Sequence, residues 1–234
     1  MIDGLLFDKD GTLFDFRASW GRWAAGFLSS IARDAAHADR LGAAIGFDMA
    51  TLTFAPDSPV IAATAADIAA ALQPYLPGET VGSLTERIDA SAGSSPMSQA
   101  VPLRPLLTTF RDRGLKIGLA TNDSEAPARQ HLAAHGITDC FDFIAGYDSG
   151  HGAKPGPGMC LAFARMQGLD PARVAMVGDS RHDLEAGRAA GMRTIAVLTG
   201  IARRADLAAY ADVVLDDIGA IPAWLDAQPA CVPD

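Results

Sequence analysis

The sequence predicts an α/β fold, in which a parallel sheet carries helices on both faces and an all-helical segment is inserted near the N-terminus. The first observation is that short apolar runs alternate with stretches of helical spacing from residue 101 onward. Parallel strands need long crossovers, which are usually helices, so this alternation favours a parallel sheet. The second observation is that residues 18–92 are rich in alanine and show helical spacing alone.

The elements of the sheet are expected in a regular order. Short apolar runs predict strands that are buried on both faces, at 5–7, 115–120, 141–145, 174–177, 194–198 and 213–215. Helical spacing predicts helices at 103–113, 125–134, 158–167, 183–190 and 218–225. Gly114 and Gly136 support two of the helix ends, because glycine commonly follows the last helical turn.

The inserted segment contains apolar stripes at helical spacing, and no strand is expected in it. The stripes run over 20–31, 60–72 and 81–88. The chain is therefore predicted to divide into an α/β core of residues 1–16 and 97–234 and a helical cap of residues 17–96.

Composition and charge favour a soluble globular enzyme. The 234 residues are 49% hydrophobic and 20% charged, close to the globular average, which argues against disorder. The net charge is −9, and no basic cluster is longer than Arg203-Arg204, so neither nucleic acid nor an anionic membrane is an expected partner. An anionic substrate would have to be attracted by local positive groups or by a bound metal.

Cysteine usage and the N-terminal sequence predict a cytoplasmic protein. Cys140, Cys160 and Cys231 are scattered without metal-ligand spacing, and we expect them to be reduced packing residues. No secretory signal precedes Asp8, and no apolar stretch is long enough to span a membrane.

The most informative motif is the junction of the first strand with Asp8 and Asp10. Two carboxylates spaced two residues apart at a strand end are expected on the same side of the backbone, and Gly11 lets the chain turn away. Such a pair is unfavourable unless a cation or a proton separates the charges. A divalent metal with oxygen ligands would satisfy this need and leave one carboxylate to attack or to carry a proton. The alternative is a turn with solvated acids.

Three further polar segments are expected near this pair. Thr121-Asn122-Asp123 follows one predicted strand, residues 178–183 follow another, and the loop between them carries Lys154. Functional groups of a parallel sheet collect at the carboxyl ends of its strands, beside the point where the strand order reverses. Any one of these segments could be a simple turn, but together they indicate a site.

These residues resemble the motifs of the haloacid dehalogenase-like (HAD) superfamily of phosphotransferases. Residues 8–12 match its DxDGT motif, Thr121 the second motif, Lys154 the third, and residues 178–183 the GDxxxD motif, in the right order. The predicted cap is similar to that of the helical-cap subclass, and the layout is most similar to phosphoglycolate phosphatase-type hydrolases. The resemblance implies a Rossmann-like core.

The resemblance also implies roles for the first and last motifs. Asp8 would be the nucleophile that forms an aspartyl-phosphate, and Asp10 would protonate the leaving alcohol and then activate water. Mg²⁺ would lie between the Asp8 carboxylate, the backbone carbonyl of Asp10 and Asp179. Asp183 would orient Lys154 or a metal-bound water rather than bind the metal.

The middle motifs would bind the phosphate. The Thr121 hydroxyl and neighbouring amides, including that of Asn122, would hold phosphate oxygens. Lys154 would neutralise the charge that develops during transfer.

The resemblance implies a Mg²⁺-dependent phosphatase that hydrolyses a small-molecule phosphate monoester, with phosphoglycolate as one candidate. Two alternatives remain open: a phosphosugar mutase of the β-phosphoglucomutase type, and a catalytically idle member kept for binding. The intact motif set argues against the idle protein.

Residues near the first motif carry less specific expectations. Lys9 is expected to point away from the two aspartates, and Trp20 and Trp23 to be core residues of the first cap helix. Arg17 or Arg22 could pair with a substrate carboxylate, and a solvated surface position is the alternative.

The histidines are expected to be mainly structural or exposed. His151 lies close to Lys154 in the sequence and could touch substrate, although a lone loop histidine is more often exposed. His182 is expected to order its turn, and His131 and His135 to lie on a helix surface.

Overall fold

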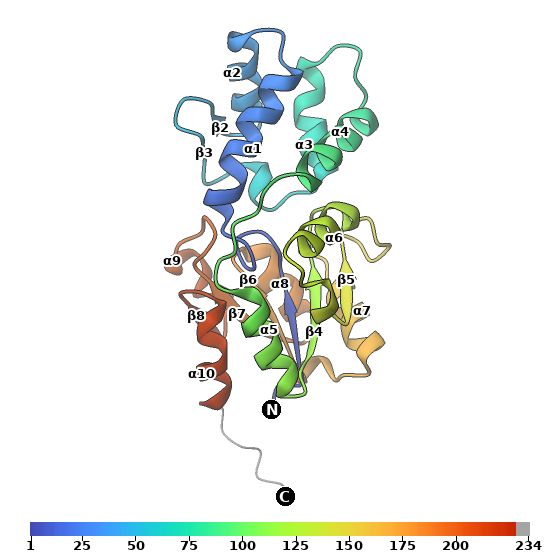
Figure 1. Ribbon diagram of the computed structural model, residues 1–234, viewed down its shortest axis with the longest axis vertical. Coiled ribbons are helices and arrows are strands. Elements are labelled where there is room, and N and C mark those ends of the chain that lie inside the picture. Colours follow the sequence, from blue (N-terminus) through green and yellow to red (C-terminus); the bar gives the residue numbers. More distant parts are fainter. Residues whose placement is uncertain (228–234) are drawn as a thin grey trace, which may run out of the picture.

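The computed structural model describes residues 1–227, and its core is one sheet of parallel strands (Figure 1). The strand order is β5-β4-β1-β6-β7-β8. The strands are β1 (Gly4–Phe7), β4 (Lys116–Ala120), β5 (Phe143–Ala145), β6 (Val174–Gly178), β7 (Arg193–Val197) and β8 (Val213–Leu215). The parallel α/β core is confirmed, and each strand lies within a few residues of its expected position.

The strand order reverses at β1, which pairs with β4 on one side and with β6 on the other. Leu5 lies opposite Ile117 in β4 and opposite Ala175 in β6. The carboxyl ends of β1, β4 and β6 therefore lie side by side. The crevice beyond such a reversal is where ligands bind in open parallel sheets.

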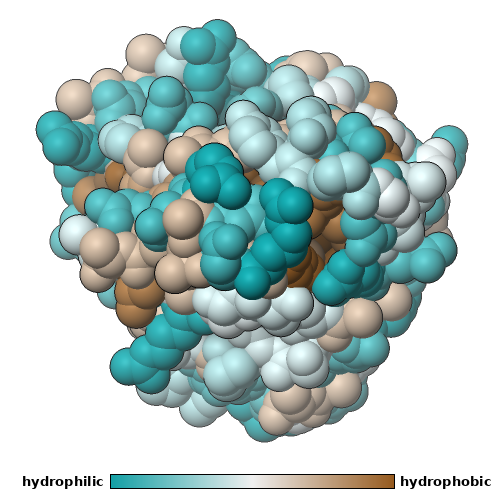
Figure 2. Space-filling model, turned by 90° about the horizontal axis from the view of Figure 1, so that it is seen from above, coloured by the Kyte–Doolittle hydropathy of each residue, from teal (hydrophilic) through white to brown (hydrophobic). Residues whose placement is uncertain are grey.

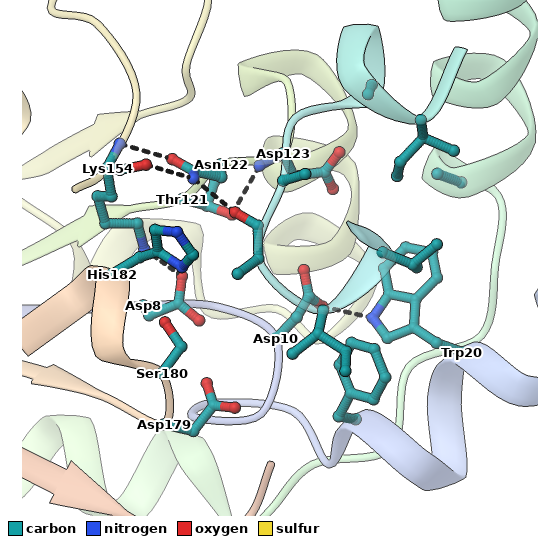
Figure 3. A pocket seen from close by; sticks show the side chains of 18 of the residues that line it. Asp8, Asp10, Trp20, Thr121, Asn122, Asp123, Lys154, Asp179, Ser180 and His182 are labelled. Atoms are coloured by element: carbon teal, nitrogen blue, oxygen red, sulfur yellow. Dashed lines mark hydrogen bonds and ion pairs between the residues drawn. The ribbon is translucent and has the colours of Figure 1, made fainter. Parts of the chain in front are cut away.

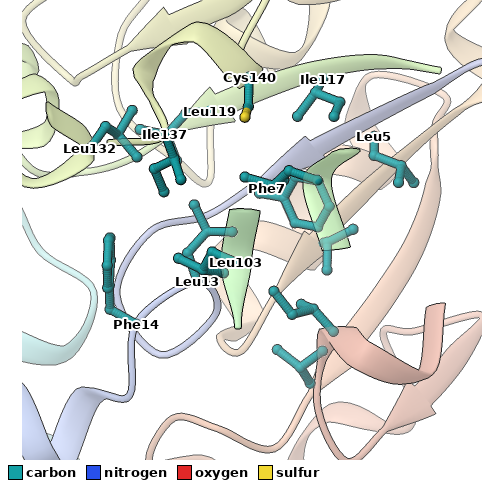
Figure 4. Packing of buried hydrophobic residues seen from close by; sticks show 14 of the residues in the cluster. Leu5, Phe7, Leu13, Phe14, Leu103, Ile117, Leu119, Leu132, Ile137 and Cys140 are labelled. Atoms are coloured by element: carbon teal, nitrogen blue, oxygen red, sulfur yellow. The ribbon is translucent and has the colours of Figure 1, made fainter. Parts of the chain in front are cut away.

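Helices cover both faces of the sheet because the side chains of β1 alternate between two hydrophobic clusters. Leu5 and Phe7 pack into the cluster that includes residues of α5 (Leu103–Asp112), α6 (Glu125–Ala134) and α10 (Ile221–Asp226), part of which Figure 4 shows. Leu6 packs on the opposite face against α7 (Gly158–Gln167) and α8 (Arg181–Ala189). The short α9 (Arg204–Leu207) contributes to a smaller cluster beside β7.

The inserted segment forms a second layer above the carboxyl edge of the sheet (Figure 1). It contains α1 (Phe16–Ile31), α2 (Ala35–Ala44), α3 (Ala65–Leu72) and α4 (Val81–Gly93), which we call the cap. The cap surface seen from above is mostly hydrophilic, and hydrophobic side chains show mainly in recesses (Figure 2). No helix within residues 1–227 is both long and apolar enough to cross a membrane.

The expectation of an all-helical insert is wrong in one detail. A two-stranded antiparallel sheet joins β2 (Phe47–Asp48) to β3 (Thr53–Phe54). Its strands are too short to show an alternating pattern, and Asp48 closes the turn by accepting hydrogen bonds from the backbone N–H groups of Ala50 and Thr51. The apolar stripe at 60–72 is also interrupted, because Thr64 caps the start of α3.

The chain passes between core and cap through two adjacent segments, residues 13–15 and 98–100. The N–H of Asp15 donates to the carbonyl of Ser98 at 2.8 Å, and the N–H of Ala100 donates to that of Leu13 at 3.0 Å. The predicted boundaries after residues 16 and 96 lie close to these segments. Cys140 and Cys160 are buried and free, as expected, and Cys231 lies outside the described residues.

The cap has a hydrophobic cluster of its own, which predicts a large effect of Leu84→Ala. Leu84 of α4 is fully buried in this cluster. Its truncation is expected to lower the free energy of unfolding by about 3 kcal/mol, since a cavity is left behind. Val81→Ala on the same helix, where Val81 is 39% exposed, should change it by less than about 1 kcal/mol. Denaturant unfolding measures both values, and equal effects would contradict the assigned packing.

Candidate active site

Carboxylates from two strand ends meet in a buried cluster. Asp8 follows β1, Asp179 follows β6, and Asp183 lies in the first turn of α8. One carboxylate oxygen from each lies within 4.8 Å of the others, and all three residues are buried. Figure 3 shows Asp8 and Asp179 in the same pocket as Asp10, although they come from distant parts of the sequence.

Lys154 ties two of these carboxylates together. Its ammonium donates to Asp8 Oδ1 at 2.5 Å, to Asp183 Oδ1 at 2.6 Å and to the carbonyl of Ala120 at 2.7 Å. Burial alone would lower the pKa of Lys154, but the charges of Asp183 and Asp8 raise it above its ordinary value. The amine therefore stays protonated beside Asp8.

The carboxylates outnumber the charge that Lys154 supplies. Burial raises the pKa of Asp8 to about 7; Lys154 lowers it, and Asp183 and Asp10 raise it. Burial, together with Asp183 and Asp8, also raises the pKa of Asp179 well above its ordinary value. Three buried carboxylates thus lie together, and Lys154 pairs with only two of them. Buried carboxylate oxygens with a charge deficit fit a hard divalent cation such as Mg²⁺.

Two glycines make room for the Asp179 side chain. Gly11 has φ +84°, and a Cβ at Gly11 or at Gly200 would overlap the Asp179 carboxylate. The Thr12 hydroxyl lies 3.4 Å from Asp179 Oδ1 and can donate to it. Gly11, the glycine of the DxDGT sequence, therefore has two roles. It adopts the backbone conformation that the turn requires, and its lack of a side chain leaves space for the Asp179 carboxylate.

Thr121 and Asn122 lie at the end of β4, beside Lys154. Thr121 is buried, and its hydroxyl accepts a hydrogen bond from the N–H of Asp123 at 3.1 Å. The Asn122 side chain donates to the carbonyls of Lys154 and Ala62, and it accepts from the N–H of Lys154. Its side chain thus links the loop that carries Lys154 to the end of β4.

Capping explains how α8 presents Asp183. The N–H and hydroxyl of Ser180 donate to Asp183 Oδ2 at 3.0 and 2.6 Å, while Oδ1 accepts from Lys154. Both oxygens of Asp183 are therefore engaged. Asp183 thus contacts Lys154, and its expected role in orienting the lysine stays a prediction.

The expectation that Lys9 points away from the aspartates is wrong. Lys9 is fully buried, and its ammonium lies 2.6 Å from Asp10 Oδ2 and 3.2 Å from Asp123 Oδ2. Strand β1 ends at Phe7, so the side-to-side alternation of a strand no longer applies at Lys9. Lys9 therefore neutralises Asp10, the residue expected to act as acid and base.

The expectation that His131 lies on a helix surface is also wrong. His131 belongs to α6, and its side chain is buried. Its Nε2 donates to the carbonyl of Ala92 at 2.8 Å, so Nδ1 is free to accept from Lys9 at 3.2 Å. Burial, followed by the charge of Lys9, lowers the pKa of His131 to about 4. His131 is therefore neutral and links the lysine to cap helix α4.

Trp20 is a core residue, as expected, and it also contacts the site. Its indole Nε1 donates to Asp10 Oδ1 at 2.9 Å, and the Lys9 ammonium lies 5.2 Å from the ring centroid. The sequence placed Trp20 on a helix directly after the DxDGT motif, which is the signal that could have indicated this contact.

One cavity brings together most of the predicted site residues. It is lined by Asp8, Asp10, Thr121, Asn122, Lys154, Asp179 and Asp183, and by apolar cap residues (Figure 3). His182 lines it too, whereas His151 does not. Arg17 is exposed and lines an outer groove, and Arg22 is exposed and lines neither of these two cavities.

Removal of Lys9 is expected to destabilise the protein strongly. Lys9→Met leaves Asp10 and Asp123, whose side chains are only 17% and 13% exposed, without their cation, and it should lower the free energy of unfolding by about 3–5 kcal/mol. A matched control is Lys116→Met, since the pair of Lys116 with Asp142 is half exposed and its loss should change stability by less than about 1 kcal/mol. Asp123→Asn should restore part of the loss in Lys9→Met. Chemical unfolding of the variants tests this order, and equal losses at Lys9 and Lys116 would refute it.

The effect of Lys9→Met is also expected to grow with pH. Burial raises the pKa of Asp123 to about 6, while Lys9 lowers it and Asp10 raises it. A carboxyl whose folded pKa exceeds its unfolded pKa stabilises the fold at low pH, and this contribution is lost as the pH rises through the folded pKa. Without Lys9 the folded pKa of Asp123 rises further, so the variant should lose more stability between about pH 5 and about pH 8 than the unaltered protein. If Lys9→Met lowers the free energy of unfolding by the same amount at both pH values, the pairing of Lys9 with Asp123 is contradicted.

Comparison with known proteins assigns this site to a family. Residues 2–191 match the family model described as haloacid dehalogenase-like hydrolase. A phosphoglycolate phosphatase of Rhodospirillum rubrum is 31% identical over 137 residues, which are 58% of this chain and 56% of that protein. A phosphoglycolate phosphatase of Neisseria meningitidis is 33% identical over 121 residues, or 51% of this chain and 48% of that protein. The chain thus spans about half the length of these curated relatives.

Solved structures show the same fold at lower sequence identity. A structure described as a predicted phosphoglycolate phosphatase from Haemophilus somnus is 19% identical, with a TM-score of 0.70 and coverage of 96% of this chain and 98% of that one. A β-phosphoglucomutase from Clostridium difficile is 18% identical, with a TM-score of 0.66 and coverage of 97% and 98%. The family model spans both the core motifs and the cap, and this chain therefore belongs to the haloacid dehalogenase-like hydrolases.

Proposed function

We propose that the protein is a Mg²⁺-dependent phosphatase that hydrolyses a small phosphate monoester through a phosphorylated Asp8. The observation that carries this proposal is the contact of the Asp8 carboxylate with the Lys154 ammonium, in a cavity that Asp10 also lines. A buried carboxylate held beside a cation can attack phosphorus while the cation faces the developing charge.

The proposed reaction has two steps, which are transfer of the phosphoryl group to Asp8 and hydrolysis of the acyl-phosphate. A bond forms between an Asp8 oxygen and phosphorus as the bond from phosphorus to the ester oxygen breaks, and Asp10 donates its proton to the departing alcohol. Asp10 then takes a proton from a water whose oxygen bonds to phosphorus as the bond from phosphorus to the Asp8 oxygen breaks, which releases inorganic phosphate and restores the Asp8 carboxylate. Trp20 and Lys9 hold the two oxygens of Asp10, which fixes the orientation of this carboxyl group. Thr121 and the backbone N–H of Asn122 would hold phosphate oxygens.

The donor set fits Mg²⁺ at Asp8, Asp179 and the backbone carbonyl of Asp10. Both oxygens of Asp183 already accept hydrogen bonds from Lys154 and Ser180, so Asp183 is better suited to orient its neighbours. The bound metal would supply positive charge that lets a phosphate dianion approach the Asp8 carboxylate.

The relatives' descriptions suggest phosphoglycolate as a substrate. This ester carries a carboxylate besides its phosphate, and a buried carboxylate needs a cation or hydrogen-bond donors. A cavity that binds phosphoglycolate therefore has to offer such partners to the carboxylate, whereas an uncharged ester of similar size does not need them.

Asp8→Asn is expected to keep the fold and to lower kcat by about 1,000-fold or more, because an amide cannot form the acyl-phosphate. Asp112→Asn is the matched control, since Asp112 is exposed at the end of α5. Phosphate release from a panel of monoesters measures the rates, and acid quenching should trap phosphate on Asp8 in the unaltered protein. Normal turnover by Asp8→Asn would refute the mechanism.

Metal removal should abolish activity, and added Mg²⁺ should restore it. Asp179→Ala removes a carboxylate that forms no ion pair with a lysine within residues 1–227, and it should raise the Mg²⁺ concentration for half-maximal activity by about 10-fold or more. The same titration on Asp112→Asn should match the unaltered protein. Full activity after exhaustive chelation, or an unchanged Mg²⁺ requirement in Asp179→Ala, would rule out the assigned metal site.

A further inference from the structure

Apolar side chains of the cap line the cavity above Asp8. The larger ones are Trp20, Trp23, Val60, Ile61, Ile68 and Ile88, to which we refer as the apolar roof. They come from α1, from the segment before α3, and from α3 and α4. Phe16 and alanines complete the lining, so every residue of 16–93 that lines this cavity is apolar. With the phosphate at the strand ends, the alcohol part of an ester would lie against this roof.

The polar atoms of the roof side chains already have partners. Trp20 Nε1 donates to Asp10 at 2.9 Å, and Trp23 Nε1 donates to the hydroxyl of Ser91 at 3.0 Å. The remaining roof side chains are aliphatic. They offer neither a donor to a substrate carboxylate nor an acceptor to a sugar hydroxyl.

The backbone of the roof is engaged in the same way. The N–H groups of residues 60–63 each donate to Ser58 or Pro59, at N···O distances between 2.8 and 3.3 Å. The carbonyl of Ala62 accepts from the Asn122 side chain at 2.7 Å. These hydrogen bonds stabilise the segment. They also occupy its N–H groups, which are therefore not available to donate to a substrate.

The two lysines near the cavity are already paired with carboxylates, and neither Arg17 nor Arg22 lines it. Lys154 donates to Asp8, Asp183 and a backbone carbonyl, and Lys9 is fully buried between Asp10 and Asp123. The exposed Arg17 lies on the outer groove, which it shares with acidic residues, and Arg22 lines neither cavity. His182 lines both the inner cavity and the outer groove, as Asn122 and Lys154 also do.

We propose, on the basis of the proposed phosphatase function, that the substrate is the phosphate ester of an uncharged, apolar alcohol whose alkyl or aromatic group packs against the apolar roof. Burying a carboxylate or several hydroxyls there without partners is unfavourable, whereas an apolar group gains contacts with the indole rings and isoleucines. The roof therefore disfavours both phosphoglycolate and a sugar phosphate. It also disfavours the mutase alternative, since a reorienting sugar phosphate would need polar partners on the cap side.

Matched esters test the proposal with Mg²⁺ present. Benzyl phosphate, 2-phosphoglycolate and glucose 6-phosphate all release a primary alcohol, so differences in kcat/KM report mainly on the cavity. We expect benzyl phosphate to exceed each of the others by about 10-fold or more. Calorimetric titration with benzylphosphonate and 3-phosphonopropionate, which cannot be hydrolysed at an ester bond, should give the same order of affinity without turnover.

A charge added to the roof should reverse the preference. Ile61 is half-buried and lines both cavities, so Ile61→Lys can direct an ammonium toward the alcohol part of the substrate. We expect this variant to shift the kcat/KM ratio toward 2-phosphoglycolate by about 10-fold or more. The control is Val81→Lys, because Val81 is exposed at the start of α4 and lines neither cavity. Thermal melting establishes that both variants fold, and the phosphonate titrations decide the case if Ile61→Lys does not.

The outcomes separate this proposal from the phosphatase function. Phosphoglycolate or glucose 6-phosphate preferred over benzyl phosphate, with phosphate released, would overturn the apolar substrate and leave the phosphatase standing. Selective binding of benzylphosphonate without hydrolysis of any ester would support the apolar site and overturn the phosphatase. Equal binding of both phosphonates would overturn the proposal whatever the rates.

Discussion

The site depends on how two buried lysines are shared among the carboxylates at the carboxyl edge of the sheet. Lys154 holds Asp8, and Lys9 holds Asp10, so the expected nucleophile and the expected acid each have a separate cation. Buried charges are stable only when they are paired with good geometry. Asp179 is the exception, because no lysine or arginine within residues 1–227 forms an ion pair with it. The position that lacks a protein cation is therefore the one suited to a metal.

Asp10 is one of the places where core and cap meet, besides the hydrogen bonds of Asn122 to Ala62 and of Ser124 to Asp89. Trp20 of α1 donates directly to Asp10, and Ala92 of α4 reaches it through His131 and Lys9. The indole that contacts Asp10 also belongs to the apolar roof of the cavity. If the proposed function holds, a substitution at Trp20 is expected to change substrate preference and proton transfer together, whereas Ile68 lines the cavity without contacting Asp10.

The sequence was sufficient for features that depend on local patterns. Apolar runs and helical spacing located the strands and helices of the core, and the strand-to-Asp8 junction located the site. It was insufficient where tertiary packing decides. Lys9 turns toward Asp10 because β1 ends one residue before Asp8, which no periodicity shows. His131 lies on a helix whose exposed face the cap then covers. The short hairpin at residues 47–54 carries too few residues for an alternating pattern.

The way the cap joins the core has a consequence for how such proteins diversify. Because residues 13–15 and 98–100 run side by side and are hydrogen-bonded to each other, the cap leaves and re-enters the core at one point. An insert with neighbouring ends can change in length or composition without stretching the strands beneath it. The cap residues that line the cavity can therefore change while the strand ends that carry Asp8 and Asp179 keep their positions.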